Sequence, residues 1–109
     1  MADLIKRRNY LASHLISVFN NELLFDKTEG VIRTYNKIGR QIDDIKPVSD
    51  IEYNLILDNA KYSFNQCKNP INQLKRGRKL DLVNKVILSG DLASAVAGLK
   101  ILTFYRKKE

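Results

Sequence analysis

The chain has 109 residues, of which 44% are hydrophobic and 28% are charged, and its formal net charge is +7. We expect one helical domain over residues 1–109, because this length and composition suit a single domain with a core. No uninterrupted apolar run approaches the roughly 20 residues that span a bilayer, and no signal peptide is evident. The expectation is therefore a cytoplasmic protein without a membrane span, and the single cysteine, Cys67, excludes an internal disulfide.

Apolar residues recur every three or four positions in the first half of the chain, which indicates amphipathic helices. The first predicted helix covers about residues 3–24. The second covers about residues 26–46, with Asp26 and Glu29 as a capping box and Lys46-Pro47 at its end. Its expected buried residues are Val31, Tyr35, Ile38, Ile42 and Ile45.

The second half of the chain continues the helical pattern. Ser49 with Glu52 predicts a capping box for a third helix, whose expected buried residues are Tyr53, Leu57, Ala60, Phe64 and Cys67. A fourth helix would have Asn69 as its cap, Pro70 in its first turn and a kink or split at Gly77. Its apolar residues are Ile71, Leu74, Leu82, Val83, Val86 and Ile87.

A turn is predicted at Ser89-Gly90-Asp91, and a fifth helix covers about residues 92–107. Its expected buried residues are Leu92, Ala95, Val96, Leu99, Leu102 and Tyr105. Five amphipathic helices with short connections predict an all-α antiparallel bundle.

Groups that could catalyse a reaction are scarce. The chain has one histidine, His14, beside the apolar stripe of the first predicted helix, and one cysteine, Cys67, within that of the third. A structural zinc site needs four nitrogen or sulfur ligands. Asp43 and Asp44 are adjacent, so they point to different sides of a helix, and no Gly-rich phosphate loop is present. We expect no catalytic residue, no metal and no cofactor.

Positive charge is concentrated in the second half of the chain. Residues 1–59 carry 8 Lys/Arg and 9 Asp/Glu, whereas residues 60–109 carry 11 and 3. A basic surface of this kind commonly binds the nucleic-acid backbone, and a solubilising surface is the alternative. The predicted nucleic-acid-binding residues are Arg33, Lys37, Arg40, Lys75, Arg76, Arg78 and Lys79.

These cations form two sets. Arg33, Lys37 and Arg40 share one face of the second predicted helix, while the other four surround Gly77. The basic tail 106–108 is a third cluster, for which a disordered terminus is the alternative. Tyr62 lies off the apolar stripes and could stack on a base or contact a partner.

Several segments resemble the small, all-α subunit of type III CRISPR effector complexes. They are Thr28-Glu-Gly-Val-Ile32-Arg33, Ser-Asp-Ile-Glu52-Tyr53, Leu82-Val-Asn-Lys-Val-Ile87 and the closing Leu-Thr-Phe104-Tyr105-Arg-Lys-Lys. The resemblance covers roughly residues 24–109, and Arg33 is its one matched basic residue. Glu29 and Gly30 depart from the pattern, because that family usually has Thr and Ser before its Ile-Arg pair.

The resemblance implies a non-catalytic subunit that contacts guide or target RNA, assembles with other protein subunits and associates with its own copies along a filament. Two other classes stay open. One is a bundle resembling bacteriocin-immunity proteins, which recognise a membrane receptor. The other is a DNA-binding or inhibitor protein of a phage or plasmid, although Gly77 is poorly placed for a helix-turn-helix.

Overall fold

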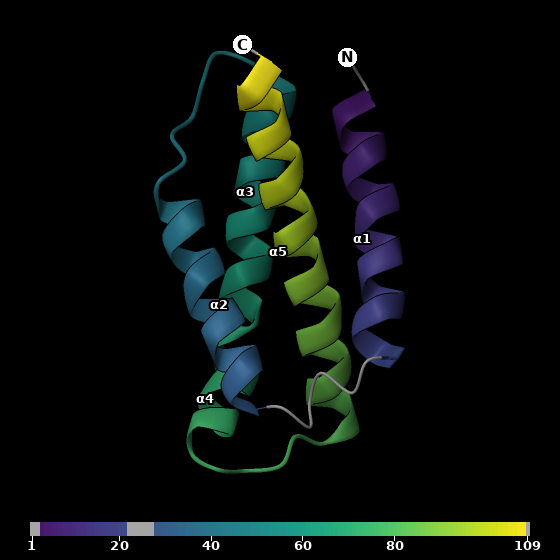
Figure 1. The fold of residues 1–109 in the computed structure, drawn as a ribbon, viewed down its shortest axis with the longest axis vertical. Coiled ribbons are helices and arrows are strands. Elements are labelled where there is room, and N and C mark those ends of the chain that lie inside the picture. The colour runs from purple at the N-terminus through teal and green to yellow at the C-terminus, as the bar shows by residue number, and fades with distance from the viewer. Residues whose placement is uncertain (1–2, 22–27, 109) are drawn as a thin grey trace.

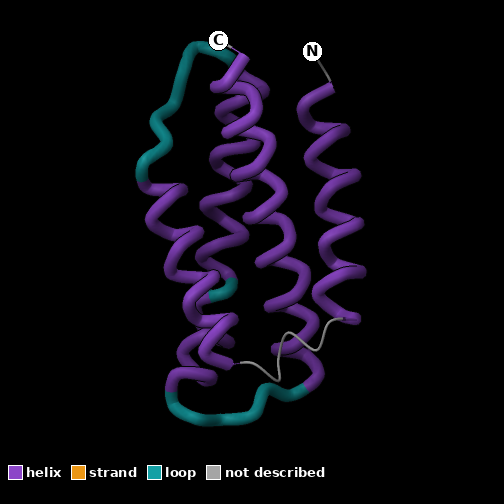
Figure 2. The backbone as a smooth tube through the Cα atoms, viewed as in Figure 1, coloured by secondary structure: helices purple, strands orange, loops and turns teal. Residues whose placement is uncertain are grey.

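The computed structural model describes residues 3–21 and 28–108, which form helices joined by loops and contain no strand. The helices are α1 (Asp3–Asn21), α2 (Thr28–Asp43), α3 (Ile51–Gln66), α4 (Lys68–Lys75) and α5 (Leu82–Lys108). Figure 1 shows the four long helices side by side along the long axis, with the short α4 at one end. Figure 2 shows that the loop after α2 and the loop after α4 lie at opposite ends of the bundle. The predicted all-α bundle is confirmed.

The central element is α5, which has 27 residues and packs mainly against α3 and α1. At about 1.5 Å per residue it is roughly 40 Å long, which matches the 42 Å length of the molecule. Its buried side chains include Leu88, Leu92, Ala95, Leu99 and Leu102. Their three- and four-residue spacing keeps them on one face, and burial of each leucine contributes about 1.5–3 kcal/mol. The predicted burial of Val96 and Tyr105 is only partial.

The break in the second half of the chain falls at Gly77 and not at Gly90. Gly77 has a φ of 75°, a left-handed conformation that favours glycine. The Gly77 N–H donates to the Leu74 carbonyl and the Arg78 N–H to the Gln73 carbonyl, each at 3.0 Å. This pair of bonds is a Schellman motif that closes α4. The predicted turn at residues 89–91 is wrong, because α5 continues through Gly90 and buries Leu88 and Leu92 on either side of it.

The first two turns of α5 expose apolar side chains. Leu82, Val83 and Val86 are 76%, 65% and 63% exposed, respectively. The sequence pattern assigned them to a fourth helix together with Ile71 and Leu74, and that assignment is wrong. They belong to α5, whose contacts with the core start with Leu88.

The segment Leu82–Tyr105 of α5 is long and apolar enough to cross a membrane by length and composition alone, with a mean hydropathy of 1.5. The segment is not an uninterrupted apolar run, because Lys85, Asp91 and Lys100 lie within it. Half of an 18-residue apolar stretch within this segment is buried inside the bundle. The core helix of a helical bundle has the same apolar composition. Its apolar character is explained by its place at the centre of the fold.

The start of α3 is held by Asp50, not by the predicted pair of Ser49 and Glu52. The Asp50 Oδ1 atom accepts a hydrogen bond from the Tyr53 N–H at 3.1 Å. Its Oδ2 atom accepts one from the Tyr105 hydroxyl, also at 3.1 Å, which joins the end of α5 to the start of α3. The predicted capping box is therefore wrong, because the cap lies one residue later.

Other helix limits differ from prediction by a few residues. α2 ends at Asp43, before Lys46, and α4 begins at Lys68. Asn69 is therefore inside α4 and does not cap it, while Pro70 lies in the first turn as predicted. The predicted cap at Asp26 and the predicted helical residues 22–24 lie outside the described residues.

Candidate nucleic-acid interface

The seven predicted cations are all exposed and lie on two neighbouring elements. Arg33, Lys37 and Arg40 follow one another along α2, and the other four lie at the end of α4 and in the loop that follows. The first turns of α2 and the whole of α4 lie at the same end of the bundle (Figure 1). We call this end, with the side chains of Arg33, Lys75, Arg76, Arg78 and Lys79, the basic end.

Aromatic contacts connect the two cation sets. The ring of Tyr35 on α2 stacks on that of Phe64 on α3, with centroids 4.4 Å apart and an interplanar angle of 8°. The Lys75 Nζ atom lies 6.0 Å from the centroid of the Tyr35 ring, within the range of a cation–π contact. Lys75 is thereby held against α2. The expectation that Tyr35 and Phe64 would be core residues is met in part, because both are half-buried.

The loop after α4 presents its cations from an ordered backbone. The N–H groups of Arg76, Gly77 and Arg78 all donate to carbonyls of the last turns of α4. Further along, the Asp81 Oδ1 atom accepts from the Asn84 N–H at 2.8 Å, which caps the start of α5. These main-chain bonds leave the side chains of Arg76, Arg78 and Lys79 exposed to solvent.

The charge of this end is hardly compensated. Residues 61–85 contain 7 Lys/Arg and a single carboxylate, Asp81, and the first turn of α2 at this end adds the carboxylate of Glu29. Among the described residues, none of these cations forms an ion pair with a carboxylate. Residues 40–52, at the other end, contain 2 Lys/Arg and 4 Asp/Glu. Asp43, Asp44, Asp50 and Glu52 give this segment a negative charge, and we call this end of the bundle the acidic end after it. Lys6, Arg7 and Arg8 in the first turns of α1 also lie at this end (Figure 1), and Arg40 is close to the segment in sequence.

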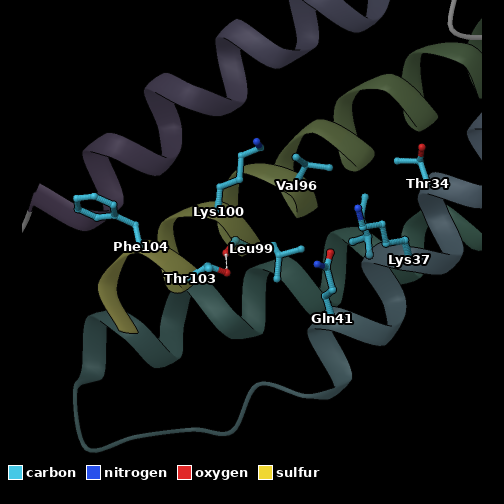
Figure 3. A pocket seen from close by; sticks show the side chains of 9 residues that line it. Thr34, Lys37, Gln41, Val96, Leu99, Lys100, Thr103 and Phe104 are labelled. Atoms are coloured by element: carbon cyan, nitrogen blue, oxygen red, sulfur yellow. Dashed lines mark hydrogen bonds between the residues drawn. The ribbon is translucent and has the colours of Figure 1, made fainter. Parts of the chain in front are cut away.

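A groove of about 630 Å³ lies between α2 and α5. Its wall on α2 includes Lys37, and its wall on α5 includes Lys100 and Phe104 (Figure 3). Ile38, Val96 and Leu99 supply apolar surface, whereas Thr34, Gln41 and Thr103 supply polar groups. Of the predicted cations, only Lys37 lines this groove.

Burial shifts the pKa values of two neighbouring titratable groups, Cys67 and Asp91. Burial raises the pKa of the Cys67 thiol to about 12, so it stays protonated at neutral pH, and its place in the core confirms the prediction. Partial burial raises the pKa of Asp91. The negative charge of Asp91 also contributes to the raised pKa of Cys67. His14 is exposed on α1. Within the described residues, no three His, Cys, Asp or Glu side chains gather as metal ligands.

Comparisons with known proteins do not assign this chain to a protein class, so the class is defined by the fold and the site. No family model, curated protein or solved structure matches the chain. The fold defines the class as an all-α helical bundle, and the site adds a basic end and a groove.

Sequence reasoning identified the cations of the basic end but missed Lys100 and Phe104. Lys100 is isolated in the sequence, and its nearest neighbours are apolar. Only the side-by-side packing of α2 and α5 places Lys100 on the same groove as Lys37. Tyr62, the predicted off-stripe tyrosine, is 62% exposed on α3. The side chains of the basic tail 106–108 lie outside the described residues.

Proposed function

We propose that this protein is a non-catalytic RNA-binding bundle whose basic end contacts the phosphodiester backbone. One observation carries the proposal: 7 of the 8 charged residues in positions 61–85 are cations. The structure presents Arg76, Arg78 and Lys79 on a loop beside the first turns of α2, without compensating ion pairs within the described residues. Clustered exposed cations of this kind bind phosphates with release of counterions.

Contacts of this type hold a nucleic acid without reading its sequence. Arg76 and Arg78 can each donate two parallel hydrogen bonds to a phosphate, while lysines act as point charges. Such a protein suits the role of a structural subunit in a ribonucleoprotein complex. The resemblance to the small subunit of type III CRISPR effectors supports that setting, in which further copies and other subunits would be partners.

The test is a titration of a fluorescently labelled RNA of about 20 nucleotides at about 50 mM and 200 mM salt. With about four phosphate contacts and a slope near −0.7 per contact, affinity should fall about 50-fold between these salt concentrations. Fluorescence anisotropy gives both dissociation constants. Undetectable binding at the lower salt concentration, or binding that is independent of salt, would exclude the proposal.

Anionic lipid vesicles are the matched control, because a basic end is also attracted to an acidic membrane surface. RNA binding should persist in the presence of vesicles that contain about 30% phosphatidylserine at the physiological salt of about 150 mM. Displacement of the RNA by such vesicles would instead favour a membrane-surface role. Nucleic acid that co-purifies with the protein at the lower salt concentration would independently support the RNA role.

A further inference from the structure

The α3 helix carries a second row of apolar side chains on the face opposite its buried one. Ile51, Leu55 and Tyr62 are 77%, 54% and 62% exposed, respectively. At about 100° per residue, these three lie within roughly 40° of one another on the helix surface. The opposite face of α3 packs against α5, where Ala60 lies beside Gly98, and Figure 1 shows α5 in front of α3. We call Ile51, Leu55 and Tyr62 the outer stripe, which no described element covers.

A small groove lies beside the outer stripe, between α1 and α3. Its volume is about 180 Å³, and it is lined by Ile5, Arg8, Leu55, Ile56 and Asn59. Leu55 therefore belongs both to the outer stripe and to this α1–α3 groove. Aliphatic side chains next to an arginine suit an aromatic ring, because a guanidinium group stacks on aromatic faces.

A second copy of α3 can supply that ring. When two α3 helices pack antiparallel along their outer stripes around a twofold axis at Asn59, Tyr62 of one copy lies level with Ile56 of the other. Ile56 is the middle of the α3 wall of the groove, between Leu55 and Asn59. The twofold axis makes the same contact twice, as in the self-complementary interfaces of most dimers.

The charges beside the outer stripe fit the same arrangement. Asp58 and Lys61 are both exposed and lie on the same side of the stripe. In the antiparallel pair, Lys61 of one copy lies about one residue, or roughly 1.5 Å along the helix axis, from the level of Asp58 in the other. A parallel pair would place Asp58 level with Asp58 and Lys61 level with Lys61. Charge complementarity therefore favours the antiparallel pair.

We infer that this protein forms a twofold dimer through the outer stripe of α3. Tyr62 of each copy occupies the α1–α3 groove of the other, and Asp58 pairs with Lys61 across the interface. The occupant is a second copy of this chain, because one surface offers the ring, the groove and both charges. The inference is independent of the proposed RNA role. The antiparallel pairing leaves the two basic ends free and directed to opposite ends of the dimer.

Sedimentation velocity of the full chain tests the inference, over protein concentrations of about 1–300 µM. The interface is small and belongs to the weak class, so the parent protein should pass from monomer to dimer with a dissociation constant on the order of 10 µM. Tyr62→Ala should raise this constant at least about 20-fold, because a central aromatic side chain is lost.

The matched control is Tyr10→Ala, which removes an equally large side chain from α1. Tyr10 is 81% exposed and does not line the α1–α3 groove. At about 100° per residue it lies roughly 140° from Ile5 around the helix, and therefore faces away from the groove. Tyr10→Ala should change the dissociation constant less than about twofold.

A charge exchange tests the antiparallel arrangement. Asp58→Lys leaves only cations at the charged contact, and Lys61→Asp leaves only carboxylates, so each variant alone should self-associate at least about 10-fold more weakly. Mixed in equal amounts, the two variants should form a heterodimer within about threefold of the parent affinity, because every cation then meets a carboxylate of the other chain. A fluorescent label on one variant identifies the heterodimer, and circular dichroism with thermal unfolding establishes that all variants are folded.

Four results would overturn the inference. The parent protein could stay monomeric up to about 300 µM, or it could associate without any dependence on Tyr62. The mixed charge variants could fail to associate, or assemblies could grow beyond the dimer as concentration rises, which would indicate head-to-tail stacking. RNA binding tests the proposed function separately, because none of these substitutions lies at the basic end.

Discussion

The two ends of the bundle use their charged residues differently. At the acidic end, Asp50 caps α3 and accepts from Tyr105, while the Asn54 side chain bonds to both main-chain groups of Val48. At the basic end, the hydrogen bonds of Arg76 and Arg78 come from the main chain, and their side chains are exposed. Charge at the acidic end therefore stabilises the fold, whereas charge at the basic end is available to a partner.

The largest expected effect comes from removing charge at the basic end. Arg76→Ala, Arg78→Ala and Lys79→Ala in one chain should weaken RNA binding about 100-fold at about 50 mM salt and lower the salt slope by about 2, since three phosphate contacts are lost. Fluorescence anisotropy measures both quantities. Thermal unfolding should be unchanged or slightly improved, because these side chains make no ion pair within the described residues.

The matched control removes the same charge elsewhere. Lys6→Ala, Arg7→Ala and Lys46→Ala in one chain substitute three exposed cations near the acidic end. Affinity should fall less than about fivefold, because only the long-range field is reduced. Equal losses for the two triple variants would show that net charge, and not the basic end, determines binding.

A smaller effect should distinguish the two ends within α2 itself. Arg33 lies in the second turn of α2 at the basic end, whereas Arg40 lies two turns further along, before Asp43 and Asp44. Arg33→Ala should weaken RNA binding about fivefold and Arg40→Ala less than about twofold, because the carboxylates reduce the positive potential around Arg40. If Arg40→Ala had the larger effect, the nucleic acid would follow the outer face of α2 rather than the basic end.

Much of the fold could be predicted from the spacing of apolar residues. The buried faces of α2 and α3 follow it closely, because a helix has one period and a soluble bundle has one apolar interior. The helix limits in the second half could not be predicted this way. Gly77 and Gly90 both interrupt apolar patterns, and the difference between them comes from tertiary packing: Leu88 and Leu92 anchor α5 across Gly90, whereas exposed residues flank Gly77.

Prediction of the candidate site was limited in a similar way. Cations that cluster in sequence, such as Arg76 and Arg78, were recognisable because neighbours in sequence remain neighbours in space. Lys100 was not, because its relation to Lys37 depends on which helices pack together. The apolar stripe of a helix shows that it packs but does not identify the helix it packs against.

The two glycines provide the third prediction, which concerns the backbone of the basic end. Gly77→Ala should lower the free energy of unfolding by about 1 kcal/mol, because alanine resists the left-handed conformation. Gly90→Ala should raise it by about 0.5–1 kcal/mol, because alanine favours a helix interior and no side chain or backbone of another element lies within 4 Å of the added carbon. Chemical denaturation measures both. Destabilisation by Gly90→Ala would show that α5 is interrupted there.

The smallest expected effect lies at the acidic end and depends on pH. The Tyr53 N–H and the Tyr105 hydroxyl donate hydrogen bonds to Asp50, and they hold the pKa of this carboxyl below its ordinary value of 3.8. Because the folded pKa is the lower one, the carboxylate contributes stability that is complete above pH 3.8 and is lost as the pH falls through the folded value. Asp50→Asn keeps a capping oxygen but cannot titrate.

The thermal midpoint of Asp50→Asn should therefore lie a few degrees below that of the parent protein at pH 7, and the gap should close at about pH 2, where the parent's carboxyl is protonated. A calorimetric scan at each pH measures the gap. A gap that stayed constant would mean that Asp50 supports α3 by its shape alone. RNA binding near neutral pH should be unaffected by this substitution, since the carboxyl lies at the end of the bundle opposite the proposed binding site.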